Sequence, residues 1–324
     1  MSLERILVTG AAGFIGSHLS EALLDDGHQV VGLDNFDTFY DPAIKRRNLA
    51  LAASNERFRL VEGDIRDPQA LEKVFETGPF EVVIHLAARA GVRPSIEDPV
   101  LYSSVNLDGS TRVLEAARRG GVRRFLFGSS SSVYGNNEKV PFSEDDRVDH
   151  PISPYAATKK AGELLCHTYH RLFEMEIACL RFFTVYGPRQ RPEMAIHKFA
   201  RLLAEGETIE QYGDGTSARD YTYISDIVAG IRAVMARSRG YQIWNLGGAR
   251  TTTLSDLVQK IAAGLGVEPR VRRLAQQPGD VDRTWADVSK ARRELAWEPQ
   301  VDIDEGLCRF LTWFQEQRQP ARGS

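Results

Sequence analysis

The sequence contains little cysteine: three residues among 324, with no Cys-x-x-Cys pair. Because Cys166, Cys179 and Cys308 are scattered, they argue against a disulfide framework and a cysteine-ligated zinc site, and we expect no metal. The chain also lacks an apolar run long enough to span a membrane. The residues before Ile6 are too few for a signal peptide. These absences predict a cytoplasmic protein with no membrane partner.

Charge of neither sign is in large excess. The chain has 41 Lys and Arg against 44 Asp and Glu, a formal net charge of -3. Because proteins that bind nucleic acid present a broad basic field, this balance argues against such a partner. We interpret the basic run Lys45–Arg47 as a solvated helix face. With 42% hydrophobic residues, the composition is typical of a globular enzyme with two domains, or with one domain and a smaller lobe.

Short apolar segments alternate with helical patterns through the first half of the chain. The expected strands are Arg5–Thr9, Gln29–Leu33, Phe58–Glu62, Val82–Leu86, Arg124–Phe127 and Ile177–Phe182. The expected helices are Phe14–Leu24, Pro42–Ala52, Gln69–Phe75, Val100–Arg118 and Pro154–Phe173. This alternation predicts right-handed βαβ units and an α/β fold of the Rossmann type, with a doubly wound parallel sheet.

After Thr184 the alternation stops. Later helices are expected at Ala195–Ala204, Ser255–Leu265 and Asp304–Gln317, and later strands at Tyr221–Ile224 and Gln242–Asn245. We expect residues 1–183, with elements from about 221–266, to form the Rossmann domain. Residues 184–220 and 267–318 would then form a smaller C-terminal α/β lobe, and residues 319–324 a frayed tail.

The first expected strand ends in a glycine-rich turn, Thr9–Gly16, which opens a helix. Such a turn lets the backbone approach a pyrophosphate, and the helix N-terminus supplies N–H groups and a partial positive charge. The second strand leads to Asp34, whose carboxylate can accept hydrogen bonds from the adenosine ribose. Since that carboxylate would repel a 2′-phosphate, NAD is favoured over NADP. A structural turn without a ligand is the alternative.

Other strand ends supply further candidates for the cofactor, because these ends face the ligand crevice of such a sheet. Asp64 is placed to meet the adenine, and the small side chains of Ala87 and Ala88 permit close approach; ordinary turn chemistry is the alternative for each. The expected cofactor contacts from the strand ends are Gly10, Gly13, Phe14, Ile15, Gly16, Asp34, Asn35, Asp64, Ile65, Leu86, Ala87 and Ala88.

Tyr155 and Lys159 are four residues apart in an expected helix, after the serine run Ser130–Ser132. Residues at this spacing share a helix face. A nearby cation favours the phenolate, so a tyrosine that normally keeps its proton until about pH 10 can act as a base near neutrality. The serine hydroxyls can hold the same substrate oxygen. An exposed helix face is the alternative interpretation.

Several longer segments occur in one order with these features. They are Tyr40–Pro42, Ala90–Arg93, Ser129–Gly135, Arg181–Pro188, Arg191–Ala195 and Arg219–Ile224. On these segments the chain resembles the extended short-chain dehydrogenase/reductases over nearly its whole length. Within them it is similar to the NAD-dependent nucleotide-sugar epimerases and dehydratases, and above all to the UDP-glucuronate 4-epimerases.

The resemblance implies roles around the reacting carbon of a UDP-sugar. Tyr155 would be the base for the sugar 4-hydroxyl, and Ser130 would share the 4-oxygen. Lys159 would lower the pKa of Tyr155 and hold the nicotinamide ribose, and both Tyr155 and Lys159 would contact the cofactor. Asn106 matches a position in the cofactor pocket, with a satisfied polar helix residue as the alternative.

The resemblance also implies contacts with the UDP group. Arg219 matches an arginine that clamps the pyrophosphate, with a surface ion pair to Asp220 or Asp214 as the alternative. Gln277 and Asp280 match residues near the uridine ribose. Many UDP-galactose 4-epimerases have an arginine in place of this glutamine.

In these enzymes NAD⁺ removes a hydride from C4, and the later steps differ. Dehydratases and decarboxylases carry acidic residues where this chain has Ser131 and Ser132, and neither hydroxyl suits carbanion chemistry. The sequence therefore favours return of the hydride to the opposite face, which inverts C4. Thr184 and Arg191 are the candidates for holding the C5 carboxylate of a uronate; a pair between Arg191 and Glu193 is the alternative.

The sequence also allows other functions. The protein could act on UDP-glucose or UDP-N-acetylglucosamine, or less readily as a decarboxylase or dehydratase. A non-catalytic nucleotide sensor is disfavoured because a binder has no need for Ser130, Tyr155 and Lys159 together. The family forms dimers through the helices matching Val100–Arg118 and Pro154–Phe173, so the resemblance implies a homodimer.

Overall fold

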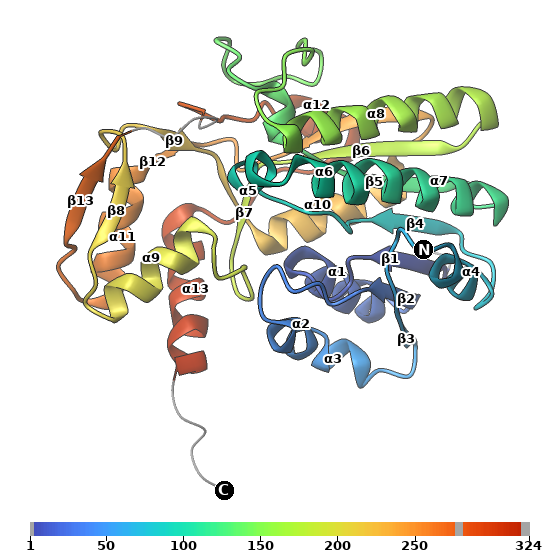
Figure 1. Ribbon diagram of the computed structural model, residues 1–324, viewed down its shortest axis with the longest axis horizontal. Helices are drawn as coiled ribbons and strands as arrows, with labels where there is room; N and C mark the ends of the chain where they lie inside the picture. The colour runs from blue at the N-terminus through green and yellow to red at the C-terminus, as the bar shows by residue number, and fades with distance from the viewer. Residues whose placement is uncertain (1–2, 276–280, 319–324) are drawn as a thin grey trace, which may run out of the picture.

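The computed structural model describes residues 3–275 and 281–318, and within them the chain folds around a seven-stranded parallel sheet (Figure 1). The strand order is β11-β6-β5-β4-β1-β2-β3. The strands are β1 (Arg5–Thr9), β2 (Gln29–Asp34), β3 (Phe58–Glu62), β4 (Val82–His85), β5 (Arg124–Ser130), β6 (Glu176–Phe182) and β11 (Tyr241–Leu246). The order reverses at β1, which confirms the predicted doubly wound α/β fold.

Helices cover both faces of this sheet. One face packs against α1 (Phe14–Asp25) and α10 (Ile224–Arg237), and the other against α4 (Pro68–Phe75), α7 (Ser110–Arg119) and α8 (Pro154–Phe173). Successive residues of β1 enter opposite cores: Ile6 and Val8 face α1 and α10, whereas Leu7 faces the other layer. Central strands such as β1 therefore carry apolar residues on both faces rather than alternating with polar ones.

The helix expected at Val100–Arg118 is not a regular α-helix. It consists of α6 (Pro99–Ser103), a π-helical turn (Ser104–Gly109) and α7, preceded by the separate helix α5 (Val92–Glu97). Ser110, the first residue of α7, donates a hydrogen bond of 2.6 Å from Oγ to the carbonyl oxygen of Asn106 in the π-helical turn. Such turns are frequent at functional sites, and this one holds Asn106 behind the β4 strand end. The expected helix Pro42–Ala52 is likewise split, into α2 (Pro42–Asn48) and α3 (Ala50–Ala53).

A smaller lobe lies to the left of the sheet in Figure 1. It contains α9 (Ala195–Ala204), β8 (Ile209–Tyr212), α11 (Leu254–Leu265), β13 (Val271–Leu274) and α13 (Ile303–Arg318). Short strand pairs join it to the main body: β7 (Thr184–Tyr186) with β10 (Tyr221–Tyr223), and β9 (Ala218–Arg219) with β12 (Thr252–Thr253). The helix α12 (Ser289–Leu295) returns beside β11.

The domain limits remain a prediction, and the packing favours one adjustment to them. Because α11 packs against α9 and α13, we assign Leu254–Leu265 to the smaller lobe rather than to the Rossmann domain. None of the helices in the described part of the chain combines the length and hydropathy of a membrane span.

Candidate active site

A cavity of about 380 Å³ opens at the carboxyl ends of the strands. It brings together the twelve strand-end candidates: Gly10, Gly13, Phe14, Ile15, Gly16, Asp34, Asn35, Asp64, Ile65, Leu86, Ala87 and Ala88. The same cavity is lined by Ser130, Ser131, Ser132, Tyr155, Lys159, Thr184 and Arg191. Residues from distant parts of the sequence therefore share one site, and their contacts with ligands remain predictions.

The glycine-rich turn has the tight geometry that a pyrophosphate needs. Gly10 has φ +70°, and a Cβ on Gly16 would lie 2.1 Å from the Gly10 carbonyl oxygen. Helix α1 begins after Gly13, and no side chain caps its first N–H groups. These N–H groups face the cavity end of the turn, where an anion would be stabilised. The residues present therefore fit the phosphates of a dinucleotide.

Asp34 lies at the end of β2 and supports this turn. Its Oδ2 accepts the Ala12 N–H at 3.0 Å, and its Oδ1 accepts the Phe36 N–H at 2.9 Å. Burial raises the pKa of Asp34, whereas these N–H groups and the charge of Lys45 lower it. Since each carboxylate oxygen can accept two hydrogen bonds, capacity remains for ribose hydroxyls.

The interpretation of Lys45 as a solvated residue is wrong. Its side chain is buried and lines the cavity, with Nζ 4.9 Å from the centre of the Tyr40 ring. Burial lowers its pKa, and the charges of Asp34 and Asp37 oppose that effect. In the sequence Lys45 is hidden within a basic run, and only its neighbours Arg46 and Arg47 fit the expected exposed helix face.

Asp64 and Asn35 form a charged part of the wall. Arg66 donates to Asp64 through Nη2 at 2.8 Å and Nε at 3.0 Å, and Asn35 donates through Nδ2 at 2.9 Å. The hydrogen bonds from Arg66 are the largest influence on Asp64 and lower its pKa to about 2. Asp64 is therefore ionised at neutral pH and holds the Asn35 amide at the cavity wall.

Asn106 lies behind the cavity wall and is not among its lining residues. Its amide oxygen accepts the Arg89 N–H at 2.8 Å, and its amide nitrogen donates to the Arg89 carbonyl at 2.9 Å. Arg89 lines the cavity and pairs with Asp37 at 2.7 Å. Asn106 thus positions the loop after β4 instead of contacting the cavity itself. Sequence reasoning missed Arg89 and Asp37, which join two loops only in the folded chain.

Tyr155 and Ser130 contact each other in the cavity wall. Burial raises the pKa of Tyr155, and the hydrogen bond with Ser130 and the charge of Arg191 lower it. Ser130 Oγ donates to Ser132 Oγ at 3.1 Å and accepts the Ser132 N–H at 3.1 Å. The serine at the end of β5 is therefore held by its own turn, facing the phenol.

The side chain of Lys159 is directed toward the end of β5, and its role toward Tyr155 remains a prediction. Its Nζ donates to the Gly128 carbonyl at 2.7 Å and lies 5.9 Å from the centre of the Tyr155 ring. Burial lowers the pKa of Lys159 to about 8. The ammonium is turned toward β5, and the pKa of Tyr155 is raised by burial, against the opposing effects of the Ser130 hydrogen bond and the charge of Arg191.

The segment that joins the main body to the smaller lobe contributes a cation and a hydroxyl to the cavity. Thr184 of β7 and Arg191 of the following loop both line the cavity. Arg191 Nε also pairs with Glu193 at 3.1 Å, with 19% of the arginine side chain exposed. The alternative ion pair therefore exists, and the arginine still lines the site.

Of the three residues expected to contact the UDP group, the structure describes only Arg219. Arg219 does not line this cavity: its Nη1 donates to the carbonyl oxygens of Ala218 and Asp282 at 3.1 and 3.3 Å. The carboxylate of Asp220 is fully buried and accepts the Ala286 N–H at 3.0 Å, so it stabilises the local backbone. Gln277 and Asp280 lie outside the described residues.

Comparisons with known proteins agree with this geometry. The family model described as GDP-mannose 4,6 dehydratase matches residues 7–310. A UDP-glucuronate 4-epimerase of Thermodesulfobacterium geofontis is 44% identical over 311 residues, which cover 96% of each chain. The structure of UDP-glucuronic acid 4-epimerase from Bacillus cereus, in complex with UDP-glucuronic acid and NAD, has a TM-score of 0.91 and 38% identity, covering 97% of this chain and 99% of that one.

Relatives with another activity share the fold. A dTDP-glucose 4,6-dehydratase from Streptomyces venezuelae, solved with NAD bound, has a TM-score of 0.91 and 34% identity, covering 97% of this chain and 98% of that one. The overall shape therefore does not separate epimerases from dehydratases. It does establish, with the family match, that the chain belongs to the GDP-mannose 4,6-dehydratase family of extended short-chain dehydrogenase/reductases.

Proposed function

We propose that the protein is an NAD-dependent 4-epimerase that interconverts UDP-glucuronate and UDP-galacturonate. The observation that carries this proposal is the composition of one cavity. Tyr155 and Ser130 form a proton-transfer pair there, and Thr184 and Arg191 provide a hydroxyl and a cation for a carboxylate. The relatives from Thermodesulfobacterium geofontis and Bacillus cereus carry the name of this activity.

Each residue of the pair has a definite task in this reaction. NAD, when bound, accepts the hydride of C4 and later returns it. Tyr155 takes the proton of the 4-hydroxyl, and Ser130 holds the same oxygen, so that the developing carbonyl keeps a hydrogen-bond partner. Inversion requires the 4-keto sugar to present its other face before Tyr155 returns the proton.

The distribution of acids supports an epimerase over a lyase. Among the described residues that line the cavity, the acids are Asp34, Asp37 and Asp64, all at or after the ends of β2 and β3. The positions after Ser130 are Ser131 and Ser132. A dehydratase or decarboxylase needs a further proton donor or acceptor beside the sugar, and this part of the wall supplies hydroxyls.

One experiment tests the proposal against its alternatives. Purified protein is incubated separately with UDP-glucuronate, UDP-glucose and UDP-N-acetylglucosamine, and products are identified by NMR while CO₂ is monitored. We expect a C4-inverted uronate without CO₂. Conversion of only the neutral sugars would favour a hexose epimerase, CO₂ release a decarboxylase, and no turnover of any sugar a binding protein.

The acidic residue of β2 supports a choice between the two nicotinamide cofactors. We expect Asp34→Asn to weaken NAD binding by about tenfold and to improve NADP binding, because the charge that repels a 2′-phosphate is lost. Fluorescence titration with NADH and NADPH measures both. Asp67→Asn is the control, since Asp67 caps α4 outside the cavity. An unchanged ratio of the two affinities would contradict the assignment.

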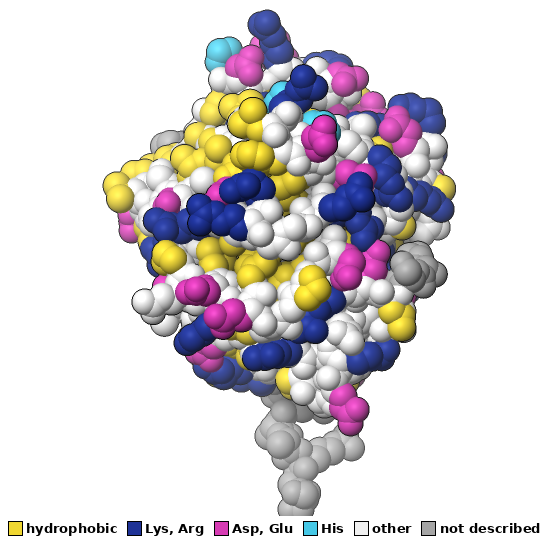
Figure 2. Space-filling view, turned by 90° about the vertical axis from the view of Figure 1, so that its right-hand side faces the viewer, with side chains coloured by type: hydrophobic (Ala, Val, Ile, Leu, Met, Phe, Trp, Pro, Cys, Tyr) yellow, Lys and Arg dark blue, Asp and Glu magenta, His cyan; other side chains and the backbone are white. Residues whose placement is uncertain are grey.

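A homodimer and a cytoplasmic location complete the proposal. Figure 2 shows hydrophobic side chains gathered in the upper part of one face of the molecule. On the outer side of α8, the exposed fractions are 58% for Leu164, 67% for Leu172 and 42% for Phe173, and Val100 of α6 is 76% exposed. Large exposed apolar side chains on neighbouring helices support an interface.

We expect light scattering to give a dimer for the unmodified protein and a monomer for Leu172→Glu, because the introduced charge would be buried unpaired in the interface. Leu51→Glu is the matched control, since Leu51 of α3 is 63% exposed and lies on another helix. A monomeric unmodified protein at micromolar concentration would refute the dimer.

A further inference from the structure

The catalytic helix α8 contacts the end of β5 at a third point, one turn beyond Lys159. Glu163 continues the four-residue spacing of Tyr155 and Lys159, so all three share one helix face. Ser129 Oγ donates to Glu163 Oε1 at 2.7 Å. The helix face therefore meets three successive strand residues: Gly128 through Lys159, Ser129 through Glu163, and Ser130 through Tyr155.

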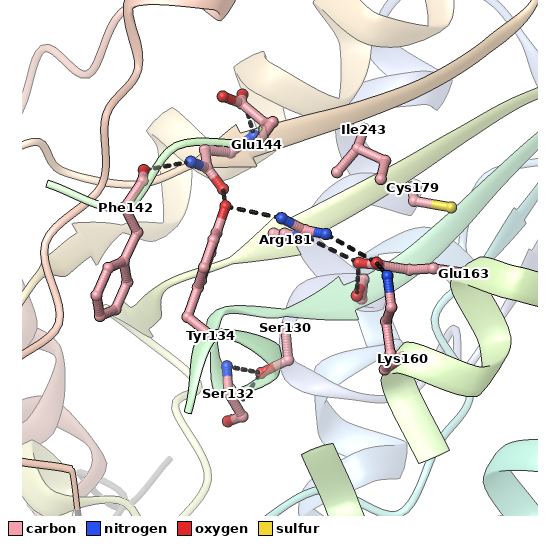
Figure 3. A network of polar contacts seen from close by, with 12 residues as sticks. Ser130, Ser132, Tyr134, Phe142, Glu144, Lys160, Glu163, Cys179, Arg181 and Ile243 are labelled. Carbon is pink, nitrogen blue, oxygen red and sulfur yellow. Dashed lines mark hydrogen bonds and ion pairs between the residues drawn. The ribbon is translucent and has the colours of Figure 1, made fainter. Parts of the chain in front are cut away.

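Glu163 is held by a buried ion pair that contacts neither the cavity nor solvent. Arg181 of β6 donates to both carboxylate oxygens of Glu163, Nε to Oε1 and Nη2 to Oε2, each at 2.9 Å. The side chains of both residues are 1% exposed, and Lys160 Nζ lies 3.7 Å from Oε2 at the outer edge (Figure 3). Burying such a pair is costly, and replacing it by apolar side chains is often neutral or stabilising.

The pair belongs to a row of polar side chains across three strands. Ser129, Arg181 and Asn245 are register partners on β5, β6 and β11. Arg181 Nη1 donates to Tyr134 Oη at 3.0 Å (Figure 3). Tyr134 Oη donates to Asn245 Oδ1 at 2.7 Å. Asn245 in turn donates to the Phe142 carbonyl at 2.8 Å. Because these contacts satisfy one another, the row is rigid.

Neighbouring strand residues point to opposite sides, so the row and the cavity are coupled through the backbone. Both serines line the cavity, but the Ser129 hydroxyl donates to Glu163, whereas the Ser130 hydroxyl contacts Tyr155. Any shift of Ser129 along the helix face therefore changes the separation of the Ser130 hydroxyl and the Tyr155 phenol.

We propose that Glu163 and Arg181, acting through Ser129, are positioning residues that set the register between α8 and β5 and thereby the contact of Ser130 with Tyr155. The proposal rests on the proposed function for its kinetic test. It differs from a merely structural role, in which the buried pair would affect folding alone.

The contact between Ser130 and Tyr155 should affect the pH dependence of the reaction rate. Tyr155 is faced by Lys159 of its own helix, Ser130 of β5, Tyr102 of α6 and Arg191 of the loop after β7. Among these groups, Ser130 and Arg191 lower the pKa of Tyr155. A weakened contact with Ser130 should therefore move the acidic limb of the rate profile to higher pH, because less phenolate is present at a given pH.

Ser129→Ala tests the hydrogen bond between Ser129 and Glu163 alone, since it removes the hydroxyl and leaves the ion pair of Glu163 and Arg181 in place. We expect kcat to fall about tenfold with an unchanged KM, since a small misplacement of catalytic groups costs rate rather than binding. The acidic limb should shift upward and the melting temperature should change little. Unchanged kcat and pH profile would overturn the proposal.

The double variant Glu163→Leu with Arg181→Met separates positioning from folding. It removes both charges together, so a folded protein is expected. If the pair positions Ser129, the folded double variant should have a low kcat and an acidic limb at higher pH than the unmodified protein. If the pair is merely structural, the folded double variant should be fully active. Lys160→Ala is the control, because it removes only the outer ammonium, 3.7 Å from the carboxylate.

A measurement that needs no turnover distinguishes a failure of the positioning proposal from a failure of the proposed epimerase function. The phenolate absorbance of Tyr155 is obtained as the difference between each protein and its counterpart carrying Tyr155→Phe. If Ser129→Ala ionises at higher pH than the unmodified protein, positioning is supported even where no UDP-sugar is converted and the proposed function fails. Identical titrations would overturn the positioning proposal whatever the substrate.

Discussion

Tyr155→Phe is expected to lower kcat for UDP-glucuronate by about 100- to 10,000-fold, the usual contribution of a general base. The ring and its packing remain, and only the hydroxyl that faces Ser130 is lost. NAD binding should be unchanged within about twofold, because the Tyr155 hydroxyl is one among many expected cofactor contacts in the cavity. Initial rates by coupled assay and NADH titration measure the two effects.

The pH profile provides the internal check. A tyrosine base works when deprotonated, so the rate of the unmodified enzyme should rise with pH through the pKa of Tyr155 in the substrate complex. The residual rate of Tyr155→Phe should lack this limb. Tyr169→Phe is the matched control: it makes the same change on the same helix, where the hydroxyl contacts Glu115 at 3.2 Å. Retention of more than a tenth of the activity by Tyr155→Phe would exclude it as the base.

The parts of the fold that could be predicted are those encoded by neighbouring residues. Strands such as Arg5–Thr9 are short, apolar and bounded by a glycine turn, and the structure has them at the expected bounds. Because these strands are parallel and their carboxyl ends share one edge, the candidates Asp34, Asp64 and Ala87 also reach one cavity. Local pattern and topology together were sufficient here.

The parts that could not be predicted depend on partners far away in the sequence. Lys45 is buried beside the Tyr40 ring and close to the charge of Asp34, and its basic neighbours conceal this in the sequence. The ion pair of Glu163 and Arg181 joins a helix to a strand, and neither residue has a local signal that separates it from a surface charge. Polar groups buried by tertiary contacts are recognised only when both partners are placed.

The carboxylate site distinguishes a uronate epimerase from its neutral-sugar relatives, and Arg191 is its most direct test. Arg191 and Thr184 line the same cavity as Tyr155 and Ser130, and the charge of Arg191 acts on the Tyr155 phenol. A 4-keto uronate is a β-keto acid, and it loses CO₂ when its C5–C6 bond aligns with the carbonyl π system. An arginine that holds the carboxylate in another orientation prevents this alignment while it supplies binding energy.

Arg191→Ala is therefore expected to lower kcat/KM for UDP-glucuronate by about 30- to 150-fold, the loss of one charge-assisted contact of some 2–3 kcal/mol. What turnover remains should release CO₂ in part. Any rate on UDP-glucose should fall less, since that sugar has no carboxylate to hold. NMR of products from substrate labelled at C6 measures epimer and CO₂ together.

Two further variants show which property of the arginine matters. Arg189→Ala is the control from the same loop, because Arg189 pairs with Glu21 at 2.7 Å and does not line the cavity. Arg191→Lys keeps the charge that lowers the pKa of Tyr155 but loses the planar fork. If Arg191→Lys keeps the acidic limb and still releases CO₂, the fork orients the carboxylate. Unchanged turnover of UDP-glucuronate by Arg191→Ala, without CO₂, would show that the carboxylate is held elsewhere.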